Sequence, residues 1–242
     1  MLRLIRSELY RLAHKKSLYV YFGALAVAYL LVIYVRSGGF TAQSITDDAI
    51  TFFNFLPALA GGFLFAALYT DDLNSKNLIT LVGFGMSKAK IVTTKLVLMA
   101  VLSALVFALV PLFHCAAYSL LGWPATASDW LVVYAVSLKA FLTTLAFAAV
   151  AGIAVYGLQR TTFAMVLYIL LSFGVISSLL MVALKSFAPS LADYLMSGIS
   201  SRITAAVIGG GALTVPAVEY VIYVLLAAGL SIVVFYKKEM EF

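Results

Sequence analysis

The residue types that carry out catalysis or hold metal ions are few in this chain, and they are scattered. Its 242 residues include two histidines, one cysteine and ten acidic side chains. His114 and Cys115 are neighbours, but the chain offers no cluster of further ligands around them. With one cysteine, an internal disulfide is excluded. We therefore interpret His114 and Cys115 as packing residues and predict no catalytic centre, no metal site and no cofactor bound by this chain.

Polar residues gather in a definite order in one stretch, residues 69–95 (YTDDLNSKNLITLVGFGMSKAKIVTTK). Two acids come first, followed by capping residues, a short apolar patch, two glycines, and a serine before a lysine-rich run. Ser, Asn and Asp accept hydrogen bonds from the free amides of a helix start, and glycine suits a helix stop. The order predicts a short helix, a turn and a second helix. A short helix with an apolar face needs something to pack against. Our candidate docking residues are Asp71, Asp72, Ser75, Leu78, Leu81, Met86, Ser87 and Lys88.

The composition is that of an all-α integral membrane protein. The chain is 64% hydrophobic and 11% charged, with a mean hydropathy of +1.08, whereas a soluble domain is about 25% charged. Six spans of about 20 residues fit its length. The predicted spans, in one transmembrane domain covering residues 1–242, are 18–35, 51–69, 96–115, 140–158, 163–184 and 217–236.

The net charge of +6 does not indicate nucleic acid, because the basic residues stand in short groups beside apolar runs. Twelve of the sixteen basic residues fall at the two chain ends or in the loops after predicted spans two and four. With six spans, these four segments lie on the same side of the membrane. The other four basic residues are Arg36, Lys139, Lys185 and Arg202. The positive-inside rule then places both termini and residues 69–95 in the cytoplasm.

Lys139 decides where span four is placed. If the span covered 131–150, this lysine would lie near the bilayer midplane, at about 2.5–3.5 kcal/mol on insertion scales. If the span covers 140–158, Lys139 lies at the outer boundary, where its ammonium group reaches water. The second placement costs less, so we adopt it. Glu219 is interpreted in the same way, as a boundary residue at the outer end of span six.

The segments outside the spans also predict structure. Residues 2–16 carry leucine and isoleucine on one helical face and basic residues on the other, which predicts an interfacial helix on the inner leaflet; a solvated basic terminus is the alternative. Residues 185–216 are too long for a hairpin and too apolar for a free loop. They predict re-entrant helices in the outer leaflet, with Gly209, Gly210 and Gly211 as a candidate outer gate.

Span two contains Pro57 and small residues at four-residue spacing, Ala58, Gly62 and Ala66. Such spacing allows close helix contact, and proline loosens the helix. Two interpretations stay open: a kinked helix that lines a pathway at a subunit interface, or ordinary packing inside one bundle. The candidate pathway residues are Phe52, Asn54, Phe55, Pro57, Ser172 and Ser177.

This layout resembles a type-2 permease of the ABC transporter superfamily. In that family an acid ends span two, a short apolar coupling helix follows, and a Gly-x-Ser-Arg-like turn and a lysine open span three. The matching residues are Asp71 or Asp72, then 78–82, then GMSKAKIVTTK, with Lys88 in place of arginine and Lys95 as the closing lysine. The ends SELYRLAHKKSLYVY and FYKKEMEF are similar too. The family's frequent Gly-Thr is absent.

The resemblance implies a function and partners. The coupling helix would dock on a separate ABC ATP-binding subunit, which binds ATP and Mg, because this chain has no phosphate-binding loop. A second permease copy or a related permease would complete the unit in a bacterial plasma membrane. Similar permeases export amphipathic or antimicrobial peptides or confer self-immunity; a lipid-like, polysaccharide or drug cargo stays open. A non-transporting scaffold or sensor subunit is the alternative, and a membrane enzyme is disfavoured because no acid or histidine lies deep in a predicted span.

Overall fold

The computed structural model describes residues 2–41, 43–74, 77–187, 191, 193–209 and 211–238. Throughout these ranges the regular elements are helices, and no strand occurs among them. The predicted all-α fold is therefore confirmed. The helices are α1 (Leu2–Ala13), α2 (Lys16–Arg36), η1 (Ser37–Gly39), α3 (Ser44–Phe53), η2 (Pro57–Gly61), α4 (Gly62–Asn74), α5 (Asn77–Gly83), α6 (Lys88–Leu120), α7 (Ala127–Leu158), α8 (Thr161–Ser172), α9 (Val175–Phe187), α11 (Met196–Gly209) and α12 (Thr214–Lys237).

Five helical segments of the described chain are long and apolar enough to cross a membrane. A bent pair, Thr161–Ser172 with Val175–Lys185, makes a sixth if it is counted as one span. The coarse prediction of a multi-pass helical protein is thus confirmed. The five segments are Lys16–Gly39, Ser44–Thr70, Lys88–Leu120, Ala127–Leu158 and Thr214–Lys237.

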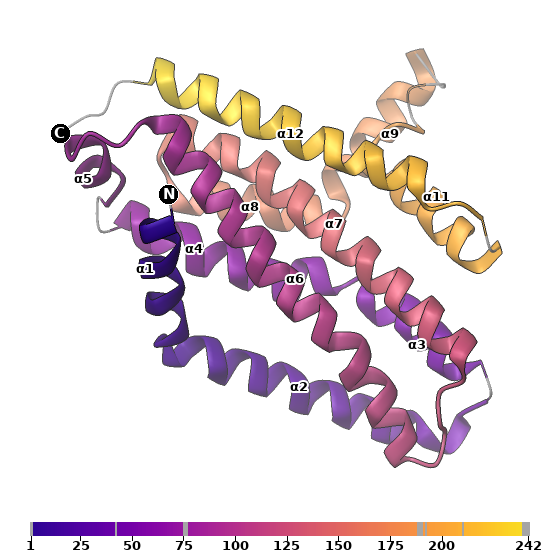
Figure 1. The fold of residues 1–242 in the computed structure, drawn as a ribbon. Coiled ribbons are helices and arrows are strands. Elements are labelled where there is room, and N and C mark those ends of the chain that lie inside the picture. The colour runs from indigo at the N-terminus through magenta and orange to yellow at the C-terminus, as the bar shows by residue number, and fades with distance from the viewer. Residues whose placement is uncertain are drawn as a thin grey trace.

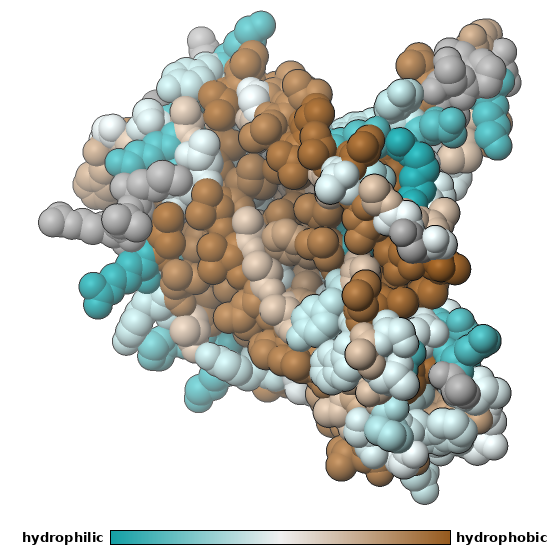
Figure 2. Space-filling view, turned by 45° about the vertical axis from the view of Figure 1, so that its right-hand side comes forward, coloured by the Kyte–Doolittle hydropathy of each residue, from teal (hydrophilic) through white to brown (hydrophobic). Residues whose placement is uncertain are grey.

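The bundle has two distinct ends. Helices α1 and α5 and the last turn of α12 lie together at one end, which we call the terminal end, and the α6–α7 connection lies at the other, the far end (Figure 1). Hydrophobic residues fill the middle of the face in Figure 2, and hydrophilic residues gather toward its left and right edges. This banding is what a bilayer-spanning bundle presents to lipid and water.

Helix α7 is the centre of the bundle, with α12, α6, α8, α3 and α11 packed around it. It begins at Ala127 because Thr126 and Asp129 form a capping box. Small residues let its neighbours approach closely: a Cβ built on Gly157 would lie 2.9 Å from Val234 Cγ1 of α12. The apolar core therefore runs along α7, and the other helices are positioned by it.

Span two begins earlier than predicted, at Ser44 rather than residue 51. Ile45 and Ala49 of α3 are buried, and the acid between them, Asp48, is buried as well. Asp48 Oδ1 lies 2.5 Å from an Arg36 guanidinium nitrogen, so the ion pair allows this carboxylate to enter the bundle. Because Asp48 is charged, residues 44–50 were left outside the predicted span.

Span five is not the single straight helix that 163–184 predicts. Helices α8 and α9 are bent by 63° relative to each other. Gly174 lies at the break with φ +72°, a left-handed conformation that only glycine adopts without strain. The bend turns α9 away from the bundle (Figure 1) and leaves room beside α7 for α11.

The amphipathic N-terminal segment forms α1, and its apolar face packs on the bundle. Leu12 is 2% exposed and belongs to the main core, with Ile5 and Leu9 packed against it. Glu8, also buried, forms ion pairs with Arg11 (2.7 Å) and with Lys95 of α6 (3.2 Å). The contacts attach α1 to the terminal end of the bundle.

Candidate functional site

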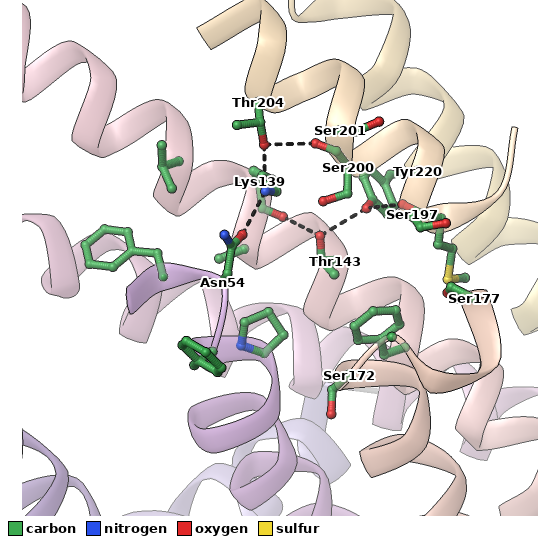
Figure 3. A pocket seen from close by; sticks show the side chains of 18 of the residues that line it. Asn54, Lys139, Thr143, Ser172, Ser177, Ser197, Ser200, Ser201, Thr204 and Tyr220 are labelled. Carbon is green, nitrogen blue, oxygen red and sulfur yellow. Dashed lines mark hydrogen bonds between the residues drawn. The ribbon is translucent and has the colours of Figure 1, made fainter. Parts of the chain in front are cut away.

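A cavity of about 730 Å³ opens between five parts of the chain: the end of α3 with the turn that follows, α7, the α8–α9 break, α11 and α12 (Figure 3). Such a volume is in the range of small-molecule sites. Five of the six predicted pathway residues line it. They are Asn54, Phe55, Pro57, Ser172 and Ser177.

Phe52 is the pathway candidate that the structure places elsewhere. Its ring packs edge-on against Tyr29, and the Arg36 guanidinium lies 5.8 Å from its centroid. Phe52 is therefore part of the packing between α2 and α3. Its neighbours in sequence, Phe53 and Asn54, line the cavity.

Lys139 is the charged residue of the cavity, and its position differs from the expected one. It is 7% exposed, and its ammonium group donates hydrogen bonds to Asn54 Oδ1 and Thr204 Oγ1, both at 2.8 Å (Figure 3). The side chain is turned into the bundle and does not extend toward water, so the expected snorkelling conformation is wrong. The two acceptors come from span two and α11, which makes snorkelling unnecessary.

A second set of hydrogen bonds lies one turn further along α7. The Thr143 hydroxyl lies 2.8 Å from the Lys139 carbonyl oxygen and 3.2 Å from the Tyr220 hydroxyl. Tyr220 donates in turn to the Met196 carbonyl (3.1 Å). These bonds join α7, α11 and α12 and hold the cavity floor in place.

Helix α11 presents hydroxyl groups to the cavity, and we did not predict this from the sequence. Ser197, Ser200, Ser201 and Thr204 all line it. Their three- to four-residue spacing is a helical face, a signal that was available in residues 185–216. On another face Arg202 donates to Glu219 Oε1 of α12 (3.2 Å), so this carboxylate has its own cation.

Three large apolar side chains stand at the rim of the cavity, beside the exposed polar residues Asn54 and Ser201. Phe55, Phe173 and Ile208 line it and are 50%, 61% and 66% exposed. Exposed large apolar side chains on a membrane bundle face lipid chains. The site thus combines a polar floor that contains Lys139 with a mouth where large apolar side chains are exposed.

Span two departs from regular α-helix where it lines the cavity. After Pro57 the chain makes one π-helical turn, η2, and the Pro57 carbonyl accepts a hydrogen bond from Tyr168 of α8 (2.8 Å). A Cβ on Gly61 would overlap the Tyr168 hydroxyl, and one on Gly62 would lie 3.5 Å from the same ring. The two glycines thus allow close packing inside this bundle, and a role of span two in a pathway at a subunit interface stays a prediction.

The predicted short helix is present as α5, but its apolar side is turned toward the bundle. Leu78 is 5% exposed and belongs to the core, and Leu81 and Met86 are half-buried against it. The turn after α5 closes through a Met86 N–H to Leu81 carbonyl bond (3.1 Å), with Gly85 at φ +80°; the predicted glycine stop is confirmed. Phe84, at the tip, is 83% exposed.

Two further docking candidates, Ser87 and Lys88, anchor the start of α6. Ser87 is the N-cap of α6 and accepts from the Lys90 amide (3.4 Å), as predicted. Lys88 donates to the Phe235 and Lys238 carbonyls, both at 2.8 Å, and so ties this turn to the end of α12. Lys95 is buried and donates to the Leu68 carbonyl (3.4 Å) in addition to its contact with Glu8. The side chains of Asp71 and Asp72, and the whole of Ser75, lie outside the described residues.

The three glycines predicted as an outer gate lie at the α11–α12 connection. Gly209 ends α11, and the Gly211 amide donates to the Ala206 carbonyl (2.7 Å). Gly210 lies outside the described residues. Gly209 and Gly211 do not line the cavity, and a gating role stays a prediction.

His114 and Cys115 are buried in α6 near the far end. His114 Nε2 lies 2.9 Å from the Ile45 carbonyl, and Nδ1 contacts the Tyr29 hydroxyl. Within the described residues no group of three or more metal-ligating side chains occurs. These bonds fix α2 and α3 against α6.

Compared with known proteins, the chain matches no family model, no curated protein and no solved structure. The function must therefore be argued from the geometry: a membrane bundle with the Lys139 cavity, a second cavity lined in part by Arg160 and Lys238, and a short helix at its terminal end.

Proposed function

We propose that this chain is the membrane-spanning permease subunit of an ATP-driven ABC exporter that moves an amphipathic peptide or a lipid-like substrate. The observation that carries the proposal is the α4–α5–α6 connection. A seven-residue helix joins two candidate spans at the end of the bundle where α1 and α12 also lie. Core contacts of Leu78 hold it in place, and Phe84 projects from its tip.

A rigid projection is what transmission of movement requires. The turn after α5 is tied to α12 through Lys88 and continues directly into α6. A force applied at Phe84 would therefore move α6 and α12 together, and α12 packs along α7 beside the cavity. In the proposal, an ATP-binding subunit with its ATP and Mg supplies that force from the cytoplasm.

The rest of the transport unit follows from the same proposal. Both termini lie in the cytoplasm of a bacterial cell, and α1 lies at the inner leaflet. A second copy, or a related permease, completes the pair of bundles that two ATPase subunits would drive. The cavity at Lys139 lies toward the far end and would belong to the outward pathway, with α11 as the re-entrant helix beside it.

The test is co-purification from the native host in mild detergent, with mass spectrometry of the associated proteins. The intact chain is expected to retain a stoichiometric ATP-binding subunit. Phe84→Asp is expected to lose it, because a carboxylate would replace the exposed ring at the contact. Leu78 is unsuitable for this test because it is buried, and its replacement would disturb the core.

Phe187→Asp is the matched control, because Phe187 is 89% exposed but lies in α9. It should retain the ATPase. Loss from both variants, or from neither, would contradict docking at α5. If the intact chain retained no ATP-binding subunit, a scaffold or sensor role would replace the exporter proposal.

A further inference from the structure

We propose that the cavity binds the anionic head group of an amphiphile, with Lys139 as its counter-ion and the apolar rim against its chain. The binding site stands without any assumption about transport. Its use as a cargo site rests on the proposed exporter function.

The first argument is charge. Lys139 is buried, and no carboxylate of the described chain lies within ion-pair distance of its ammonium group. Buried cations are normally paired with an anion. No described Asp or Glu lines the cavity, and Glu219 of α12 is paired with Arg202. The cavity therefore has an uncompensated positive charge.

The second argument is hydrogen-bonding capacity. An ammonium group has three N–H donors, and Lys139 uses two of them, on the neutral acceptors Asn54 and Thr204. On α11, the Ser197 hydroxyl oxygen is buried and has no hydrogen-bond partner among the described residues. It lines the same cavity (Figure 3). One ammonium donor of Lys139 is thus available for an oxygen of a phosphate or carboxylate, whereas Ser197 lies seven residues, or about 10 Å, along α11 from Thr204 and marks a separate polar point of the cavity.

The third argument is the rim. Phe55, Phe173 and Ile208 are exposed where the cavity opens, so a ligand reaches Lys139 past apolar side chains. A head group with an attached chain satisfies both regions, whereas a free inorganic anion satisfies only the floor. The volume of about 730 Å³ accommodates a head group with part of a chain.

The experiment measures binding of radiolabelled dodecyl phosphate to the purified full-length chain in dodecyl maltoside, without any ATPase. Saturable binding is expected. Unlabelled dodecylphosphocholine, which has the same chain and no net charge, should compete poorly, and inorganic phosphate should compete more weakly than unlabelled dodecyl phosphate. Lys139→Gln should lower the affinity by about tenfold to a hundredfold, the usual effect of losing a hydrogen bond to a charged group.

Four further variants make the result specific. Lys139→Arg keeps the charge and should keep binding, and Lys185→Gln removes an exposed basic residue outside the cavity and should change nothing. Because Lys139→Gln affects the core, Ala205→Glu provides a second test. Ala205 is an exposed lining residue, and a carboxylate there would pair with Lys139 and prevent binding, whereas Ala205→Gln would not.

Equal affinity of the intact chain and Lys139→Gln would overturn the proposal, as would full competition by dodecylphosphocholine. If inorganic phosphate competed as well as dodecyl phosphate, the site would bind a free anion and the amphiphile would be wrong. The binding assay contains no ATPase, so an absence of dodecyl phosphate binding would not contradict the exporter proposal. Equally, an absence of ATPase co-purification would not contradict the anion site at Lys139.

Discussion

Gly61 lies where span two, α7 and α8 come closest together. A Cβ at this position would overlap the Tyr168 hydroxyl and lie 2.7 Å from Thr144 Cγ2. Tyr168 is fully buried and bonded to the Pro57 carbonyl, so it has no free space to move into. We expect Gly61→Ala to destabilise the bundle by about 1–3 kcal/mol, the usual cost of overpacking a core, measured as a lower melting temperature in detergent.

Gly23 is the matched control for this prediction. It lies in α2, and a Cβ built there meets nothing within 4 Å. Gly23→Ala should leave stability unchanged or raise it by about 0.5–1 kcal/mol, because alanine favours a helix. Equal melting temperatures for the two variants would mean that Gly61 does not have the packing role assigned to it.

Single residues also mark the limit of prediction from sequence. Asn54, Phe55 and Pro57 were among the pathway candidates of span two, and all three line the cavity. The acceptors of Lys139 could not be predicted, since Thr204 is 65 residues away and reaches it only because α11 folds back beside α7. The insertion cost of Lys139 was judged without these hydrogen-bond acceptors. A position at the membrane boundary therefore seemed more favourable for Lys139 than a position inside the bundle.

At the scale of elements, the break between α8 and α9 gives the cavity one of its walls, since Phe173 and Gly174 both line it. Gly174 has φ +72°. Gly174→Ala should destabilise the protein by roughly 1–2 kcal/mol, the cost of an L-residue in the left-handed region. Gly174→Asn should cost less, because asparagine adopts this conformation more readily.

Melting temperatures of both variants in the same detergent provide the test. The alanine variant should melt below the asparagine variant, and the asparagine variant near the unchanged chain. If alanine were tolerated as well as asparagine, the bend would not depend on the left-handed glycine, and another cause would be needed for the 63° angle.

The elements differ in how well sequence predicted them, for physical reasons. The start of α6 and the turn after α5 depend on local signals, Ser87 and Gly85, and both were predicted. The side of α5 that faces the bundle depends on tertiary packing: an apolar patch at Leu78 and Leu81 indicates burial without indicating against what. Phe84, the exposed residue, was not among the candidates.

At the scale of the whole molecule, the distribution of charge and the fold agree on which parts share a side. Helix α1, the α5 turn and the end of α12 lie at one end of the bundle, and the basic residues that the positive-inside rule counts as cytoplasmic belong largely to these segments. The fold thus brings these segments to one end of the bundle. Labelling from one side of the membrane tests which side that end faces.

The last prediction concerns this orientation. Ser87 is exposed at the terminal end, and Ala127 is exposed at the far end, where α7 begins. The natural Cys115 is buried, and Cys115→Ala removes its background. In that background, a membrane-impermeant maleimide should label Ala127→Cys in intact cells and leave Ser87→Cys unlabelled, and inside-out vesicles should give the opposite pattern. Labelling of Ser87→Cys from outside would invert the topology and would place α5 and Phe84 where no cytoplasmic ATPase reaches them, so the exporter proposal would fail with it.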